Sequence, residues 1–264
     1  MNFGLIVVGD EILSGKRADK HLPKVIELLS ARGLSLSWAR YVGDDPARIT
    51  ADLRDAFASG DAVFSCGGIG ATPDDHTRQC AAAALGRPLV LHPQARELIL
   101  QRVRQMAQEQ GTPAEEDHPD TQRRLEMGRF PEGAAIVPNP FNRIPGFSVG
   151  DVHFVPGFPV MAHPMIESLL DTRYARLHRK DAWQERSVVV FGSMEATLTP
   201  LMEEIEARFP GVKVFSLPSV DHPQWGRHIE LGVKGEPQRV EPAYRALLAG
   251  LARYPAKLGP ELVR

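Results

Sequence analysis

Short apolar runs alternate with longer amphipathic stretches along the first 172 residues of the chain. Phe3–Val8 and Ala62–Cys66 are almost wholly apolar, which is typical of strands buried on both faces of a parallel sheet. Residues 18–32 carry apolar side chains at helical spacing and end before Gly33. This alternation predicts an α/β fold in three layers, with helices on both faces of a doubly wound, mostly parallel sheet.

The pattern restarts after Thr172. Residues 174–183 are polar and basic and read as a linker, and from Arg186 onward the pattern indicates a strand, a helix, two strands and a helix. We therefore expect two domains, an α/β domain over 1–172 and a small two-layer α+β domain of β-α-β-β-α order over 173–264.

Three loops of the first domain are expected to meet. Parallel strands end at the same edge of a sheet, and ligands bind at that edge. Residues 9–15, 43–46 and 67–77 each follow a predicted strand, and each contains Asp or Glu. Their convergence predicts a ligand site.

The third of these loops carries the clearest chemistry. Gly67, Gly68 and Gly70 allow a close approach of the backbone to a ligand, and the helix that follows directs free N–H groups at an anion. Thr72 is expected to cap that helix, with Asp75 as the acidic partner of a capping box.

Carboxylates in the same loop complicate a simple phosphate site. Asp74 and Asp75 would repel a bare phosphate, so a divalent cation such as Mg²⁺ is expected to bridge carboxylate and phosphate oxygens. The alternative is that both only offset the helix dipole, by about 0.3–1 kcal/mol each. The candidate metal ligands are Asp74, Asp75 and Asp44, with Asp44 and Asp75 as the catalytic candidates, and Asp10 or Glu11 as a further ligand or general base.

Composition narrows the class of protein. With 43% hydrophobic and 24% charged residues, the chain is an ordinary globular protein. A net charge of −2 gives no field that favours nucleic acid or an anionic membrane, and neither partner is expected. Two cysteines, no signal peptide and no long apolar run predict a cytoplasmic location. His153, inside an apolar run, is expected to be packed rather than a ligand.

Several motifs together resemble a known family. They occur in the order Gly9-Asp10-Glu11-Ile12-Leu13-Ser14-Gly15, Asp44, Gly67-Gly68-Ile69-Gly70-Ala71-Thr72 with Asp74-Asp75-His76-Thr77, Asn139-Pro140 with Pro145-Gly146-Phe147, and Pro156-Gly157-Phe158-Pro159. Residues 1–172 resemble the molybdopterin-binding (molybdenum cofactor biosynthesis) domain, in the branch of the competence/damage-inducible protein A family. The second segment is similar to the small α+β domain that follows in that family.

The resemblance implies a small phosphate-bearing ligand, either molybdopterin or a nucleotide. It implies a pyrophosphohydrolase that acts on ADP-ribose-like nucleotides with Mg²⁺, Mn²⁺ or Co²⁺. The alternative is a non-catalytic ligand-binding protein of molybdenum cofactor metabolism. By analogy the protein is expected to form a homo-oligomer. The nicotinamide-nucleotide amidohydrolase domain of many members is expected to be absent.

The family motifs also imply a set of ligand-binding residues. These are Gly9, Asp10, Glu11, Gly67, Gly68, Gly70, Thr72, Thr77, Asn139, Gly157 and Pro159. The chain departs from the family pattern at Ala71, His21 and Asn142, and Met161 stands where a glutamate is common. The missing carboxylate at Met161 argues against metal-dependent hydrolysis more than against binding.

Overall fold

A computed structural model describes residues 1–178 and 184–263. The chain divides into two compact units, Met1–His178 and Arg179–Arg264. The sequence placed the boundary at Thr172, and the first unit continues past it with a short 3₁₀ turn, η1 (Ala175–Leu177). Residues 179–183 of the expected linker lie outside the described residues.

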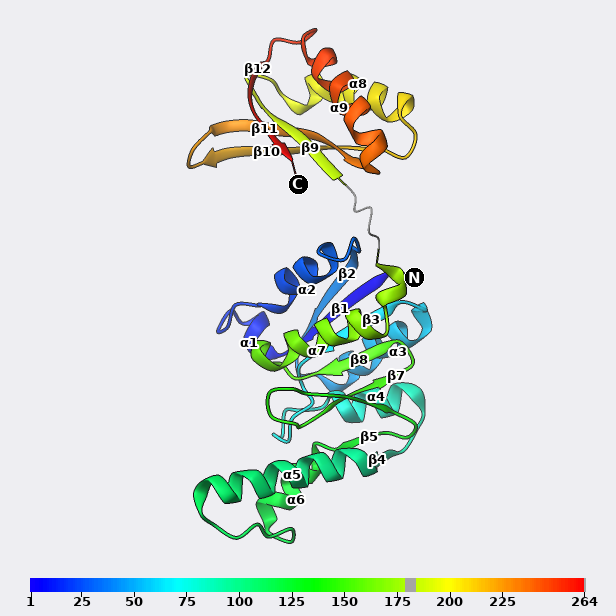
Figure 1. Cartoon of the computed structure of the whole chain (residues 1–264), viewed down its shortest axis with the longest axis vertical. Helices are drawn as coiled ribbons and strands as arrows, with labels where there is room; N and C mark the ends of the chain where they lie inside the picture. The colour runs from blue at the N-terminus through cyan, green and yellow to red at the C-terminus, as the bar shows by residue number, and fades with distance from the viewer. Residues whose placement is uncertain (179–183, 264) are drawn as a thin grey trace. The chain divides into compact units, whose positions relative to one another are not determined.

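The first unit contains most of the helices and strands (Figure 1). They follow in the order β1 (Phe3–Val8), α1 (Asp10–Leu13), α2 (His21–Ser30), β2 (Leu36–Val42), α3 (Pro46–Ser59), β3 (Ala62–Cys66), α4 (Thr77–Leu85), β4 (Leu89–Leu91), α5 (Pro93–Gln110), α6 (Pro119–Glu126), β5 (Arg129–Pro131), β6 (Ala135–Val137), β7 (Gly146–Val149), β8 (Val152–Val155) and α7 (Pro159–Thr172).

Six of these strands form one sheet, in the order β2-β1-β3-β8-β7-β6. The first four are parallel to one another, whereas β7 and β6 are antiparallel. Every residue of β1 and β3 is buried, as their apolar runs predict. The mostly parallel sheet is confirmed.

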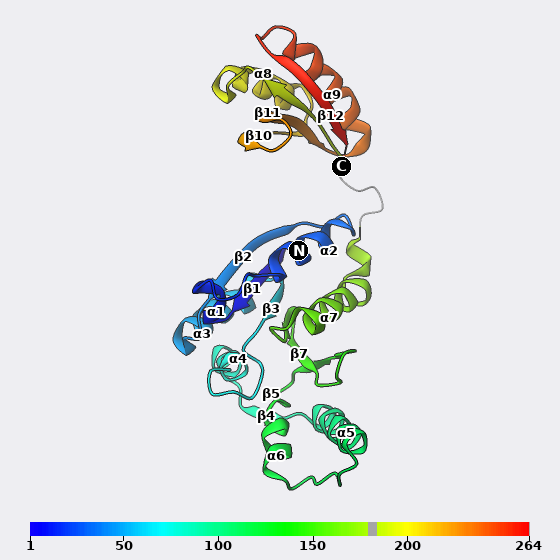
Figure 2. The ribbon, with the colours of Figure 1, turned by 90° about the vertical axis from the view of Figure 1, so that its left-hand side faces the viewer.

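Helices cover both faces of this sheet. Ile49 and Leu53 of α3 pack on one face together with α4. Val25 and Leu29 of α2 pack on the other face with Ile166 of α7. Figure 2 shows α2 and α7 on one side of the strands and α3 and α4 on the opposite side. The expected three-layer architecture is therefore confirmed.

Between β4 and β5 the chain leaves the sheet and forms α5 and α6 (Figure 1). Strands β4 and β5 pair with each other and close this excursion. Ile99 and Leu100 of α5 pack against Leu125 of α6, with Met127 and Ile144 beside them. The excursion thus brings Met127 near the loop between β6 and β7.

The second unit consists of β9 (Gln184–Phe191), α8 (Glu195–Arg208), β10 (Lys213–His222), β11 (Gly226–Gly235), α9 (Pro237–Leu251) and β12 (Lys257–Val263). Its antiparallel sheet has the order β10-β11-β9-β12, and α8 and α9 pack on it through a shared apolar core. The sequence missed β12, because Gly259 and Pro260 interrupt its pattern. No helix in the described residues is long and apolar enough to cross a membrane.

Candidate functional site

A cavity of about 470 Å³ opens at the carboxyl ends of the parallel strands, within the range of small-molecule sites. The three loops that follow β1, β2 and β3 all contribute to its wall, as the sequence predicts. The loop between β6 and β7 and the start of α7 complete it. The lining comprises Val8, Gly9, Glu11, Arg17, Asp44, Gly67, Gly68, Ile69, Gly70, Ala71, Thr72, Asp74, Asp75, Met127, Asn139, Asn142, Ile144, Pro145, Pro156, Gly157, Phe158 and Met161.

Most of the predicted site residues lie in this wall. Those that line the cavity are Gly9, Glu11, Asp44, Gly67, Gly68, Gly70, Thr72, Asp74, Asp75, Asn139 and Gly157. Asp10, Thr77 and Pro159 are not among the lining residues. Pro159 is the first residue of α7, and its role is to start that helix.

Thr77 lies beneath the glycine loop. It is fully buried, and its backbone N–H donates to the carbonyl oxygen of Gly68 at 2.9 Å. A Cβ at Gly68 would collide with the Thr77 hydroxyl oxygen. Thr77 therefore supports the loop from below instead of facing the cavity.

The glycines of this loop are required by close packing. Gly67 and Gly68 have φ angles of +105° and +67°, which side chains rarely adopt. A Cβ at Gly67 would also collide with the backbone oxygen of Val8 in β1. The loop thus rests directly on the strand next to it, and its backbone forms the cavity wall.

Thr72 and Asp75 close the loop with a turn of their own. The Thr72 backbone N–H and its hydroxyl donate to Oδ2 of Asp75 at 2.8 Å and 2.5 Å, and the Asp75 N–H donates to the Thr72 carbonyl at 3.0 Å. The contact between them is as expected, but the predicted helix cap is wrong. Helix α4 begins at Thr77 with His76 as its N-cap, because the bond from Thr77 to Gly68 folds the intervening residues over the loop.

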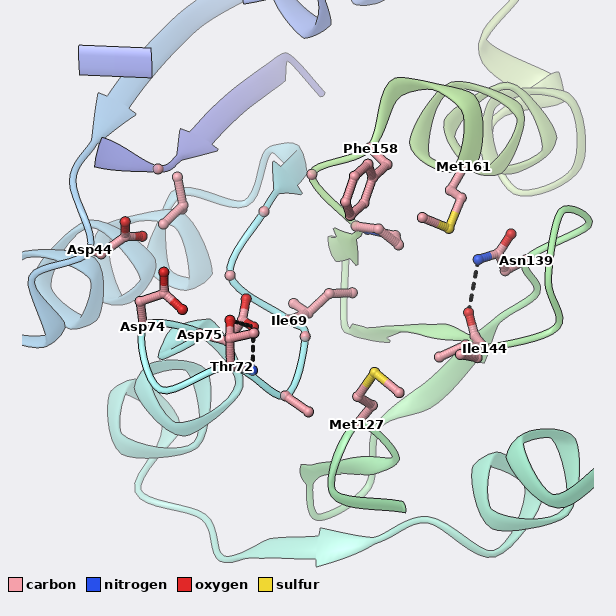
Figure 3. A pocket seen from close by; sticks show the side chains of 18 of the residues that line it. Asp44, Ile69, Thr72, Asp74, Asp75, Met127, Asn139, Ile144, Phe158 and Met161 are labelled. Atoms are coloured by element: carbon pink, nitrogen blue, oxygen red, sulfur yellow. Dashed lines mark hydrogen bonds between the residues drawn. The ribbon is translucent and has the colours of Figure 1, made fainter. Parts of the chain in front are cut away.

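Carboxylates gather on one side of the cavity, where Figure 3 shows Asp44, Asp74 and Asp75. Burial raises the pKa of Asp44, and the negative charges of Asp10, Glu11 and Asp74 raise it further. A hydrogen bond from the Asp10 amide opposes this effect. Asp44 therefore stands in a negative environment that a cation would relieve.

These carboxylates fit a cation that is shared with a ligand. Within residues 1–178 and 184–263, no group of three His, Cys, Asp or Glu side chains is arranged to hold a metal ion by itself. Mg²⁺ is usually held by one or two carboxylates together with phosphate oxygens and water. Asp44 and Asp74 can supply the protein's part of such a set.

The opposite side of the cavity is apolar, and the sequence analysis did not identify the residues that form it. Figure 3 shows Phe158, Met161, Met127 and Ile144 around this end. Phe158 is 56% exposed at the rim. These residues come from α6, the β6–β7 loop and the start of α7, so only the tertiary fold brings them together. They form an apolar slot at this end of the cavity.

Two asparagines order the loop behind this slot. Asn139 donates from Nδ2 to the carbonyl of Ile144 at 2.9 Å and to Oδ1 of Asn142 at 2.8 Å. Asn142 in turn donates from Nδ2 to Sδ of Met161 at 3.3 Å. Asn142 and Met161, two of the positions at which the chain departs from the family pattern, are thus in contact with each other.

Arg17 is a further lining residue that sequence reasoning missed. Its guanidinium lies 3.9 Å from the Glu11 carboxylate and is well exposed. It is the one cationic residue among the described residues that line the cavity. Because Arg17 follows the first acidic loop closely in the sequence, its position near Glu11 could have been predicted.

His153 has no part in the cavity. It is fully buried, and its ring nitrogens contact the Ser148 hydroxyl at 2.6 Å and the Tyr174 hydroxyl at 2.6 Å. Tyr174 also donates to Asp151 at 2.9 Å. The expectation of a packed histidine is confirmed.

Comparisons with known proteins agree with this fold. A CinA-like protein of Syntrophotalea carbinolica is 31% identical over 223 residues, which cover 79% of this chain and 51% of that protein. The chain therefore spans about half the length of that relative. A protein of Pyrobaculum calidifontis is 31% identical over 258 residues, which cover 94% of this chain and 93% of that protein.

The solved structure of CinA from Thermoplasma acidophilum, a protein described as having unknown function, is also similar. It has 26% identity and a TM-score of 0.53 and covers 65% of this chain and 98% of its own. The family model described as "Probable molybdopterin binding domain" matches residues 4–176. The chain therefore belongs to the molybdopterin-binding domain family, and CinA-like proteins are among its relatives.

Proposed function

We propose that the cavity binds a small ligand that carries a pyrophosphate and a flat ring system, together with a divalent cation. ADP-ribose-like nucleotides have this composition, and molybdopterin is the related ligand with a flat ring system and a single phosphate. One observation carries the proposal: a single cavity joins a glycine loop and several carboxylates to an apolar slot. The family, defined by a molybdopterin-binding domain, supports the same class of ligand.

Each part of the cavity has a role in this proposal. The pyrophosphate lies along the backbone from Gly67 to Gly70, where the absence of side chains permits close approach. Asp44 and Asp74 hold the cation, and Arg17 contacts a phosphate oxygen on the solvent side. The ring system lies between Met127 and Phe158.

The reaction that suits this arrangement is hydrolysis of the pyrophosphate of an ADP-ribose-like nucleotide. A bound Mg²⁺, Mn²⁺ or Co²⁺ would neutralise the phosphates and lower the pKa of a bound water. Glu11, which also lines the cavity, accepts the proton of the attacking water, while Asp44 holds the cation. Asp75, oriented by Thr72, would contact the ligand through the cation, because its carboxylate repels a bare phosphate.

Binding without turnover is the second candidate, as in a ligand-binding protein of molybdenum cofactor metabolism. It is favoured by the thioether of Met161, which occupies its corner of the cavity without a charge. The uncharged side chain removes a carboxylate that hydrolysis would use.

One experiment separates the two candidates. The protein is titrated with ADP-ribose, FAD and ATP in the presence of Mg²⁺, Mn²⁺ or Co²⁺, and the products are followed by chromatography. Cleavage of any of these compounds supports hydrolysis, whereas binding with no cleavage supports the second candidate. Asp75→Ala is expected to weaken binding at least about tenfold, or about 1.4 kcal/mol. Equal binding by wild type and Asp75→Ala would show that the site is misplaced, and Asp117→Ala, outside the lining, is the control.

A further inference from the structure

Arg78, the second residue of α4, is a buried cation. Only 3% of it is exposed, and burial lowers the pKa of its guanidinium. Its Nη2 donates to the carbonyl oxygen of Gly70 at 2.5 Å, and its Nη1 donates to the carbonyl oxygen of Glu126. Burying a guanidinium is costly unless its donors are used, and these two bonds use both Nη atoms, whereas the buried Nε has no hydrogen-bond partner among the described residues.

The two acceptors belong to opposite walls of the cavity. Gly70 is part of the glycine loop that lines it. Glu126 ends α6 and is followed directly by Met127, which lines the apolar side. A single guanidinium therefore spans the glycine loop and the excursion that carries α5 and α6.

Other contacts already hold the glycine loop on the side of the sheet. The Thr77 N–H donates to Gly68, and Thr72 donates to Asp75. Neither contact reaches α6. The bond from Arg78 to Glu126 is thus a direct hydrogen-bonded tie between the loop and the end of α6, in addition to the packing of α4 on β5.

We propose that Arg78 is the positioning residue that fixes the spacing between the glycine-loop wall and the α6 wall, and so selects ligands whose ring fits between them. The ligand part of this inference rests on the proposed function. Arginine suits the task because its planar fork presents several donors in fixed directions. Lysine is a point charge on a flexible stem and cannot hold both carbonyls in the same geometry.

Hydrogen exchange tests the tie without any ligand. The amide of Thr72 and those of Met127 and Gly128 are hydrogen-bonded and report on the two walls. Arg78→Met and Arg78→Lys are both expected to speed exchange at least about tenfold at both walls together. Arg87→Met is the matched control, because Arg87 donates to the carbonyl of Glu132 outside the cavity. Unchanged exchange at either wall in both Arg78 variants overturns the proposal.

Ligand titration tests the selection. Inorganic pyrophosphate with Mn²⁺ contacts only the loop and the carboxylates, whereas ADP-ribose with Mn²⁺ also reaches Met127. We expect Arg78→Lys to weaken ADP-ribose binding at least about tenfold and pyrophosphate binding less than about threefold. Equal losses of affinity for the two probes would assign Arg78 a general structural role and overturn the proposed selection of ligands by their ring. If wild type binds neither probe, the proposed function fails and the selection falls with it, while the exchange result still decides whether Arg78 ties the walls.

Discussion

Asp10 and Asp44 each accept a hydrogen bond from the other's backbone amide. The Asp10 N–H donates to Oδ2 of Asp44 at 3.0 Å, and the Asp44 N–H donates to Oδ1 of Asp10 at 3.1 Å. This reciprocal pair joins the loops after β1 and β2. It holds the Asp44 carboxylate at the cavity wall, where other negative charges surround it.

Burial and the neighbouring negative charges predict that the Asp44 charge is unfavourable without a cation, although the hydrogen bond from Asp10 opposes this effect. Because its pKa is raised in the folded state, stability is lost as the pH rises from 3.8 through that raised pKa. Asp44→Asn keeps an oxygen acceptor and removes the charge. Without metal, we expect the free energy of unfolding of Asp44→Asn at neutral pH to exceed that of wild type by a few tenths of a kcal/mol.

Thermal unfolding with and without Mg²⁺ and a nucleotide checks this prediction. Ligand and metal should stabilise wild type clearly and Asp44→Asn much less. The role of Asp44 would be contradicted if Asp44→Asn were less stable than wild type without metal and were stabilised by metal and nucleotide as much as wild type is.

Gly68 and Gly86 offer a matched test of the glycine loop. Their φ angles, +67° and +63°, are almost the same, but a Cβ at Gly86 meets open space while one at Gly68 meets Thr77. Gly86→Ala should cost about 1 kcal/mol of stability from backbone strain alone. Gly68→Ala should cost at least about 1 kcal/mol more and should also weaken ligand binding.

Urea unfolding and nucleotide titration of both variants provide the measurement. Thr77→Ala in the Gly68→Ala background tests the contact, since it removes the hydroxyl oxygen that the added Cβ would meet. If Gly86→Ala and Gly68→Ala were equally stable and bound ligand equally well, the loop would not need the close packing described for it.

Met161 allows a test of whether a carboxylate at this position would strengthen metal binding. Its sulfur accepts a hydrogen bond from Asn142 at the cavity wall, and a glutamate there could accept the same bond with a charged oxygen. Met161→Glu is expected to strengthen Mn²⁺ binding in the presence of nucleotide about tenfold, as a charge-assisted ligand would. Met161→Gln is the uncharged control. No difference between the two variants would remove position 161 from the metal-binding region.

His153 predicts how the first unit responds to acid. Burial lowers the pKa of His153 from 6.5 to about 3. Between these pH values the imidazole is therefore protonated in the unfolded chain but neutral in the folded chain. Stability is therefore complete above pH 6.5 and is lost as the pH falls towards 3. From about pH 7 to about pH 5, this residue should remove about 2 kcal/mol from the free energy of unfolding.

Urea unfolding of wild type and His153→Gln at these two pH values checks the effect. The variant is less stable at neutral pH, because it disturbs the contacts with Ser148 and Tyr174, but it should lose less stability in acid. An identical loss in both proteins would show that His153 is not the group responsible.

Local patterns along the chain predicted the central strands and the edge where the loops meet. The runs Phe3–Val8 and Ala62–Cys66 are so uniformly apolar that only a doubly covered strand satisfies them. The sequence predicted that Gly67 and Gly68 let the backbone approach a ligand closely. The structure shows that these glycines also lie close to β1 and Thr77.

Features that depend on distant contacts could not be predicted in this way. Met127, Ile144 and Phe158 are ordinary apolar residues until the excursion and α7 bring them to one cavity. Thr72 carries the signature of a cap, yet a tertiary bond to Gly68 moves the helix start to Thr77. Strand β12 pairs with β9 although its sequence has little strand pattern.

The most direct test of the central claim is calorimetric titration of ADP-ribose into the whole chain, with Mn²⁺ and again with EDTA. The same titration of Asp44→Asn completes the measurement. The proposed site predicts binding that weakens at least about tenfold without metal and to the same extent in the variant. Binding that is unaffected by both EDTA and Asp44→Asn, or no binding of any nucleotide or pterin phosphate to the wild-type chain, would contradict it.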